Sequence, residues 1–217
     1  HLTHQTNKMK FLKFAILFLC VAFISCKQNQ KETPTKIAVV EKTEIKYAKG
    51  FQIEKLASGI TKITITAPWP DAENAFTYAL VPKEKEESIT LNKDEYDAIV
   101  SVPVERIIVT STTHIPALEV LNVEDKLIGF PNTDFISSPK TRKNIDVKKI
   151  KELGANESLN TEMVIAMNPD VVIGFGIDGN NKTYNTLQRS NINVVYNGDW
   201  MEESPLGKAE WIKFFAP

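Results

Sequence analysis

Four short polar segments carry most of the side chains that could bind a ligand or take part in a reaction. Residues 110–114 bring four hydroxyl groups and an imidazole together, and residues 130–132 add an aromatic ring and an amide. Residues 174–178 combine glycines with an aromatic ring and a carboxylate, and residues 197–200 end in an indole. This mixture favours recognition of a bulky ligand, partly polar and partly apolar, over bond cleavage. The predicted ligand contacts are Ser111, Thr112, Thr113, His114, Phe130, Gly176 and Trp200.

Two of these side chains have a structural alternative. His1 and His4 precede the first methionine, Met9, so His114 is the one histidine in the rest of the chain. A lone histidine either makes a structural hydrogen bond or contacts a ligand, and an imidazole could cap the metal of a haem or corrin ring. Trp200 either lines a cleft or packs beneath it.

The motifs of common enzymes give little support for catalysis. Ser111 and His114 suggest a hydrolase, but the sequence has no G-x-S-x-G nucleophile motif. No glycine-rich phosphate loop follows the first strand of the α/β region. Because Cys20 and Cys26 are the only cysteines and no H-x-x-x-H pair occurs, no zinc site is predicted. We expect a binding protein with no resident metal or cofactor, and an envelope-anchored α/β hydrolase is the alternative.

Alternating strands and helices predict where the four segments lie. Strands are expected near residues 106–110, 126–130, 170–175 and 192–196, and helices near 115–121, 147–153, 161–167 and 184–189. Asn160 is expected to cap the third of these helices. The alternation predicts a Rossmann-like parallel sheet with helices on both faces, over residues 102–217. Ligands bind beyond the carboxyl ends of such strands, where the four segments stand.

Upstream of this lobe the sequence has a different pattern. In residues 45–101, apolar residues alternate with polar ones around 51–53, 60–65 and 76–81, which predicts a β-rich extension. Residues 27–44 are rich in Lys, Glu, Gln and Thr and predict a flexible tether.

The segment 9–26 has the pattern of a secretory signal. Lys10 and Lys13 precede an unbroken apolar run at 14–23, which is shorter than the ~20 residues that span a bilayer. The letters FISC resemble a bacterial lipobox, in which Cys26 would be lipidated; an ordinary cleaved signal is the alternative. We expect a membrane-anchored lipoprotein that faces the periplasm or the outside of the cell. A net charge of −1 gives no sign of nucleic-acid binding.

Four segments, in this order, resemble one family of transport proteins. They are 104–114 (VERIIVTSTTH), 121–129 (LNVEDKLIG), 168–173 (NPDVVI) and 204–214 (SPLGKAEWIKF). Each is similar to a segment of the iron-siderophore, haem and cobalamin periplasmic-binding proteins of ABC importers, the class with a helical backbone. The first is similar to their opening strand, and the last leads into their long linking helix.

The resemblance implies two lobes joined by one rigid helix, with the ligand between them. This chain would hold the N-terminal lobe, with the linking helix beginning near Leu206 and cut at Pro217, and with the second lobe missing. It would act as a monomer, bind an iron complex or corrinoid, and deliver it to an ABC permease and its ATPase. The resemblance assigns permease docking to Asp178, Glu202 and Glu203. For all three residues a solvated acidic surface is the alternative, and for the two glutamates a favourable position before a helix is a second alternative.

Overall fold

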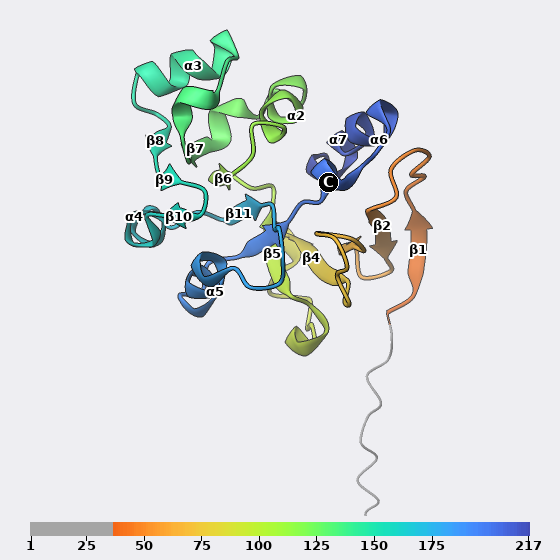
Figure 1. The fold of residues 1–217 in the computed structure, drawn as a ribbon. Coiled ribbons are helices and arrows are strands. Elements are labelled where there is room, and N and C mark those ends of the chain that lie inside the picture. The colour runs from red at the N-terminus through yellow and green to blue at the C-terminus, as the bar shows by residue number, and fades with distance from the viewer. Residues whose placement is uncertain (1–36) are drawn as a thin grey trace, which may run out of the picture. The chain divides into compact units, whose positions relative to one another are not determined.

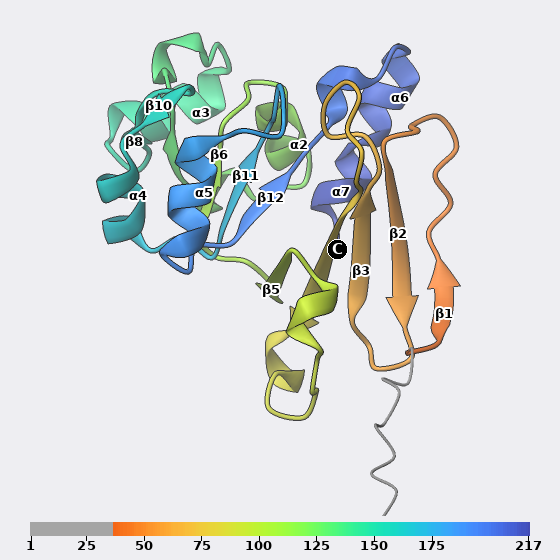
Figure 2. The same ribbon diagram turned by 60° about the horizontal axis from the view of Figure 1, so that its bottom comes forward.

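Two five-stranded β-sheets form the framework of the part of the chain that the computed structural model describes, residues 37–217 (Figures 1 and 2). These residues form one compact unit, Ile37–Pro217. The predicted signal, Cys26 and residues 27–36 of the predicted tether lie outside the described residues. Among the helices within residues 37–217, none is long and apolar enough to cross a membrane.

The N-terminal sheet forms because apolar residues alternate with polar ones along its strands. Its strands, in spatial order, are β1 (Val39–Lys42), β2 (Phe51–Leu56), β3 (Thr61–Ile65), β4 (Phe76–Pro82) and β5 (Ala98–Val102). Neighbours are antiparallel from β1 to β4, whereas β4 and β5 are parallel. In β2, Phe51 and Ile53 are buried while Gln52 between them is exposed. The three predicted strands of this region are therefore confirmed.

Strand β1 lies within the segment predicted to be a tether. Its side chains are exposed, yet Val39 pairs with Leu56 and Lys42 pairs with Glu54. An edge strand with exposed side chains can still form because its backbone hydrogen bonds do not require its side chains to be buried. The tether prediction is therefore wrong for residues 39–42.

The second sheet is entirely parallel. Its strands, in spatial order, are β12 (Val194–Tyr196), β11 (Val171–Gly174), β6 (Ile107–Val109), β7 (Leu127–Phe130) and β8 (Lys151–Glu152). Alternate residues face two different clusters, Ile107 and Val109 one and Ile108 the other. Burial of both faces explains the continuous apolar runs. The predicted α/β fold with a parallel sheet is confirmed. A separate antiparallel pair joins β9 (Gly154–Ala155) to β10 (Ser158–Leu159).

Helices cover both faces of the parallel sheet (Figure 2). They are α2 (His114–Val120), α3 (Pro139–Asp146), α4 (Thr161–Met167), α5 (Lys182–Arg189), α6 (Pro205–Glu210) and α7 (Ile212–Phe215). Val164 of α4 and Leu187 of α5 pack on one face, and Leu118 of α2 and Phe214 of α7 pack on the other. The predicted cap of α4 is confirmed, because the Asn160 side chain accepts a 2.9 Å hydrogen bond from the Met163 amide.

Two helices differ from the prediction. The chain is helical in α3 and not over residues 147–153, where a turn leads into β8. Most residues of α3 are polar, so the sequence of this helix has no apolar stripe from which it could be predicted. Residues 147–153 cannot form a continuous helix because Lys148 has a φ of 62°, which no α-helical residue adopts. The helix predicted from Leu206 is two short helices, α6 and α7, that meet at Trp211.

One apolar core joins the two sheets. Ile53 and Ile63 of the N-terminal sheet belong to the same cluster of buried side chains as Ile107 and Ile173 of the parallel sheet. The predicted division between residues 45–101 and 102–217 falls at Val102, the last residue of β5, and side chains on its two sides share this core.

Candidate functional site

The carboxyl ends of the parallel strands lie at one edge of the sheet, and four loops follow them. We call these loops the carboxyl edge: residues 110–113 after β6, 131–138 after β7, 175–181 after β11 and 197–204 after β12. Every segment predicted to bind a ligand falls in one of these loops or at its border. The topology therefore brings the predicted segments to the same edge, as expected for a parallel sheet.

The N-terminal sheet adds a fifth loop, residues 66–75 between β3 and β4. A Cβ atom added to Gly176 would lie 2.7 Å from the Trp69 ring, and one added to Gly198 would lie 2.7 Å from the Ala67 carbonyl oxygen. The fifth loop therefore packs directly on two loops of the carboxyl edge. No local sequence pattern predicts this contact, because it joins segments that are more than a hundred residues apart.

Hydroxyl groups stand at the end of β6. Thr112 and Thr113 are exposed, and Ser111 is partly exposed. The hydroxyl oxygens of Ser111 and Thr113 are 2.8 Å apart, and the Thr113 amide donates to Ser111 Oγ at 3.3 Å. The structure thus leaves these three predicted contacts accessible to a ligand.

Large apolar side chains are exposed on the other three loops. Phe135 is 71% exposed, Ile177 65% and Trp200 38%, and each follows a different strand. An exposed aromatic or aliphatic side chain at the carboxyl edge can pack against a ligand, so each of the three is a candidate contact. Trp200 was among the predicted ligand contacts, whereas Phe135 and Ile177 were not. Each of these two residues stands next to an aspartate in a loop, Phe135 after Asp134 and Ile177 before Asp178. An apolar residue in such a polar, non-periodic segment is the sequence signal that could have indicated exposure.

The structure places His114 in the interior, which contradicts its prediction as a ligand contact. Its ring is fully buried, 5.5 Å from the Phe215 ring, and neither ring nitrogen has a hydrogen-bond partner among residues 37–217. Burial lowers its pKa to about 4, although Asp199, whose Oδ1 lies 4.0 Å from Nε2, and Asn197 act to raise it. His114 is therefore neutral at pH 7, and its ring is inaccessible to a ligand.

Phe130 and Gly176 are also packed inside rather than presented to a ligand. Phe130 is 2% exposed in the core, and Gly176 lies under the Trp69 ring. Residues 174–179 have the spacing G-x-G-x-x-G after a strand, which the sequence analysis did not weigh. Here the rings of Tyr184 and Trp69 occupy the space in front of the first two glycines. The glycines permit close packing of side chains, and no room is left beside them for a phosphate.

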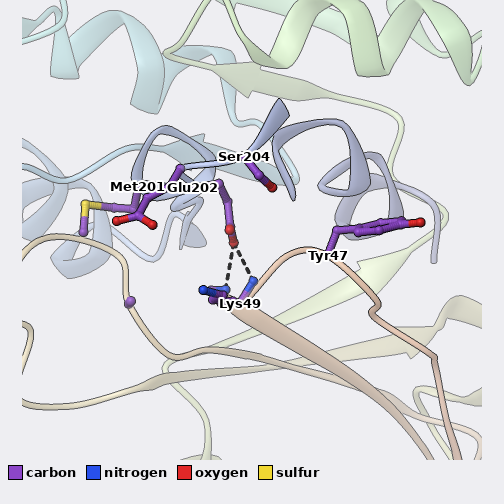
Figure 3. A pocket seen from close by; sticks show the side chains of 8 residues that line it. Tyr47, Lys49, Met201, Glu202 and Ser204 are labelled. Carbon is purple, nitrogen blue, oxygen red and sulfur yellow. Dashed lines mark hydrogen bonds between the residues drawn. The ribbon is translucent and has the colours of Figure 1, made fainter. Parts of the chain in front are cut away.

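Glu202 is buried and makes hydrogen bonds within the protein, so its predicted role in permease docking is wrong. It is 7% exposed, and its Oε1 accepts hydrogen bonds from the Lys49 amide at 2.7 Å and the Gly50 amide at 2.9 Å (Figure 3). The same oxygen accepts a 3.1 Å hydrogen bond from Trp211 Nε1. A buried carboxylate with three donors is not free to meet an arginine of a partner. The remaining space beside it is a cavity of about 270 Å³.

Glu210 has a similar role that the sequence did not suggest. It accepts hydrogen bonds from the backbone amides of Lys46, Tyr47 and Ala48 at 2.6–2.8 Å, and from Lys213 Nζ at 2.8 Å. Burial acts to raise its pKa, but the bonds from Lys213 and the three amides outweigh burial and lower the pKa to about 2. Asp178 and Glu203, in contrast, are exposed, and their docking role stays a prediction.

The described residues suit non-covalent binding better than catalysis. Ser111 is bonded to Thr113, whereas both nitrogens of His114 are unpartnered, so the pair lacks the contact of a nucleophile with its base. Within residues 37–217, no group of three or more His, Cys, Asp or Glu could hold a metal ion. Exposed rings and hydroxyls at the carboxyl edge can stack on a ligand and hydrogen-bond its polar groups.

Comparison with known proteins finds related lipoproteins whose roles are unknown. Two uncharacterized lipoproteins of Methanocaldococcus jannaschii are 30% and 23% identical to this chain, over 54% and 97% of its length. A third protein of the same organism, described only as uncharacterized, is 37% identical over 31% of the chain. The chain spans 30%, 55% and 20% of these three proteins. No protein-family model matches it.

Two solved structures of periplasmic haem-binding proteins are weakly similar. The first, HutB of Vibrio cholerae, has a TM-score of 0.41 and 19% identity, covering 52% of this chain and 40% of its own. The second, from Pseudomonas aeruginosa, has a TM-score of 0.35 and 23% identity, covering 42% of this chain and 30% of its own. TM-scores below 0.5 carry no argument for a shared role.

Proposed function

We propose that this chain carries a ligand-binding lobe of a substrate-binding lipoprotein that serves an ABC importer. The proposed ligand is a metal chelate, either an iron complex (a ferric siderophore or haem) or a corrinoid. The observation that carries the proposal is the carboxyl edge: its loops expose Phe135, Ile177 and Trp200, and one of them carries the accessible hydroxyls of Ser111–Thr113. Chelates of this kind have broad apolar faces and polar rims, which such a surface complements.

The proposal includes a lipid anchor at Cys26 on the membrane, facing the periplasm or the outside of the cell. The letters FISC support it, as do the two relatives that are described as lipoproteins. Several acyl chains on one cysteine would anchor the protein stably, because a single chain binds a bilayer only marginally.

Delivery to a permease and its ATPase is the second part of the proposal. Asp178 and Glu203 are exposed carboxylates on two loops of the carboxyl edge, so both are free to pair with arginines of a permease. Charges at the rim of an interface mainly steer association. We propose no catalytic step and no resident cofactor, and a monomer as the working form.

Titration of the full-length protein, which includes both lobes, with haemin, ferrichrome and cyanocobalamin tests the proposal. Absorbance and calorimetry should show saturable binding of one of them, with a dissociation constant of roughly 10 µM or below. Trp200→Ala and Phe135→Ala should each weaken binding about tenfold, which corresponds to about 1.4 kcal/mol. Val147→Ala is the matched control, because Val147 is 59% exposed but lies before β8, away from the carboxyl edge.

Two results would contradict the proposal. One is failure of all three chelates to bind at 100-fold excess over about 1 µM protein. The other is turnover of p-nitrophenyl acetate that Ser111→Ala abolishes, which would favour the hydrolase.

A further inference from the structure

A second cavity, of about 450 Å³, lies beside the carboxyl edge, where the fifth loop (residues 66–75) approaches α5. Its lining includes three aromatic rings, Trp69, Phe76 and Tyr196, and two carboxylates, Asp71 and Glu73. Its volume falls within the range of about 300–1,000 Å³ that is usual for small-molecule sites. None of the residues predicted to contact a ligand lines it.

The aromatic side of this cavity is a fixed cluster. Ring centroids are 5.3 Å apart for Trp69 and Phe76, 5.1 Å for Trp69 and Tyr196, and 4.9 Å for Phe76 and Tyr196. Tyr196 is 4% exposed, and its backbone amide donates a 2.9 Å hydrogen bond to the Tyr78 hydroxyl. Rings held in this way need little reordering when a ligand binds.

The charged side of the cavity is acidic and unneutralised. Asp71 and Glu73 are exposed, and neither has an ion pair or a side-chain hydrogen bond with any residue in 37–217. No lysine or arginine is among the residues that line the cavity. The site therefore presents two negative charges and aromatic rings to whatever enters it.

We propose that this cavity binds a small organic cation, an amine or a quaternary ammonium compound. The negative faces of aromatic rings attract such cations, tryptophan most strongly, and the carboxylates add a direct charge interaction. A neutral sugar could stack on the rings but would gain nothing from two unpaired carboxylates. This site is separate from the proposed chelate surface and does not depend on it.

Calorimetry of the full chain with choline tests the proposal. Choline should bind with a dissociation constant of about 1 mM or below. Its uncharged isostere, 3,3-dimethyl-1-butanol, should bind at least about tenfold more weakly, because it keeps the shape and loses the charge. Trp200→Ala, which alters the chelate surface, should leave choline binding unchanged.

A charge-neutral variant keeps the test independent of folding. In Asp71→Asn/Glu73→Gln both changes are at exposed positions, and asparagine tolerates the positive φ of 56° at residue 71. We expect choline binding to weaken about tenfold in this variant and about fivefold in Trp69→Leu. Glu87→Gln is the control, since Glu87 is exposed and does not line the cavity. Any one of three results would overturn the proposal. They are equal binding of choline and its isostere, unchanged choline binding in the charge-neutral variant, and binding of glucose without binding of choline.

Discussion

Five consecutive backbone amides, those of Lys46 to Gly50, donate to two carboxylates from the C-terminal part of the chain. Glu210 accepts the first three and Glu202 the last two. Residues 46–50 precede β2, so their backbone amides have no hydrogen-bond partner in a neighbouring strand. A buried amide without a hydrogen-bond partner destabilises the folded state. The two glutamates remove that cost, which explains why acidic residues are buried here.

Glu210→Gln should destabilise the protein at neutral pH by about 2 kcal/mol, because hydrogen bonds to a charged acceptor are stronger than neutral ones. The pKa of Glu210 falls from its ordinary 4.5 to about 2 on folding. The stabilisation is therefore fully present above about pH 4.5 and is lost as the pH falls towards 2. Urea unfolding at pH 7 and at pH 2.5 measures the difference between the wild type and the variant, which should shrink at the lower pH.

The control is Glu203→Gln, which removes an exposed carboxylate seven positions earlier. It should change the unfolding free energy by less than about 0.5 kcal/mol. An equal loss of stability in both variants would show that Glu210 is an ordinary surface charge.

Side chains of the candidate site could be predicted only where exposure follows from local sequence. Ser111–Thr113 and Trp200 are in polar loops after strands, and the structure leaves them accessible. His114 is in the same loop region, but Phe215, about a hundred residues later, covers it. Glu202 likewise becomes internal because Trp211 and the 49–50 amides meet it. Burial of a polar residue by distant segments leaves no local pattern.

At the scale of elements, the close approach of α5 to β11 depends on glycine. A Cβ atom added to Gly174 would lie 2.3 Å from the Tyr184 hydroxyl oxygen, which is 3.0 Å from Thr110 Oγ1. Gly174→Ala should therefore destabilise the protein by about 1–3 kcal/mol through overpacking. Denaturant unfolding measures the change. Gly179→Ala is the matched control, because its added Cβ would be 3.5 Å from the nearest atom of Trp69 and fits without strain.

The strands were easier to predict than the helices, for a physical reason. Strands β6, β11 and β12 are buried on both faces and are therefore continuous apolar runs. The edge strand β8 is polar and exposed, and it was missed. Helix α3 is polar, with Thr141 and Asn144 as its buried residues, so its signal is the Ser138-Pro139 start and not a stripe. The apolar residues Val147 and Ile150, which suggested a helix, lie instead in a turn.

At the scale of the whole molecule, the N-terminal sheet contributes to both proposed binding surfaces. Its fifth loop packs on the carboxyl edge through Trp69 and Ala67, and the same loop supplies Asp71 and Glu73 to the second cavity. Under both proposals, the β-rich region is therefore part of the binding architecture. Its placement also explains why glycines stand at positions 176 and 198, where a side chain would collide with the fifth loop.

The shared core predicts that residues 37–101 and 102–217 unfold together. Phe51 in β2 packs on Trp211 between α6 and α7, with ring centroids 4.5 Å apart, and the two glutamates bind the same region. Phe51→Ala should cost about 3–5 kcal/mol, and hydrogen exchange should show β11 losing protection at the same denaturant concentration as β2. Val40→Ala, at an exposed position in β1, is the control. If β2 lost protection while β11 kept it, the N-terminal sheet would be a separate domain, because one cooperative core cannot open in halves.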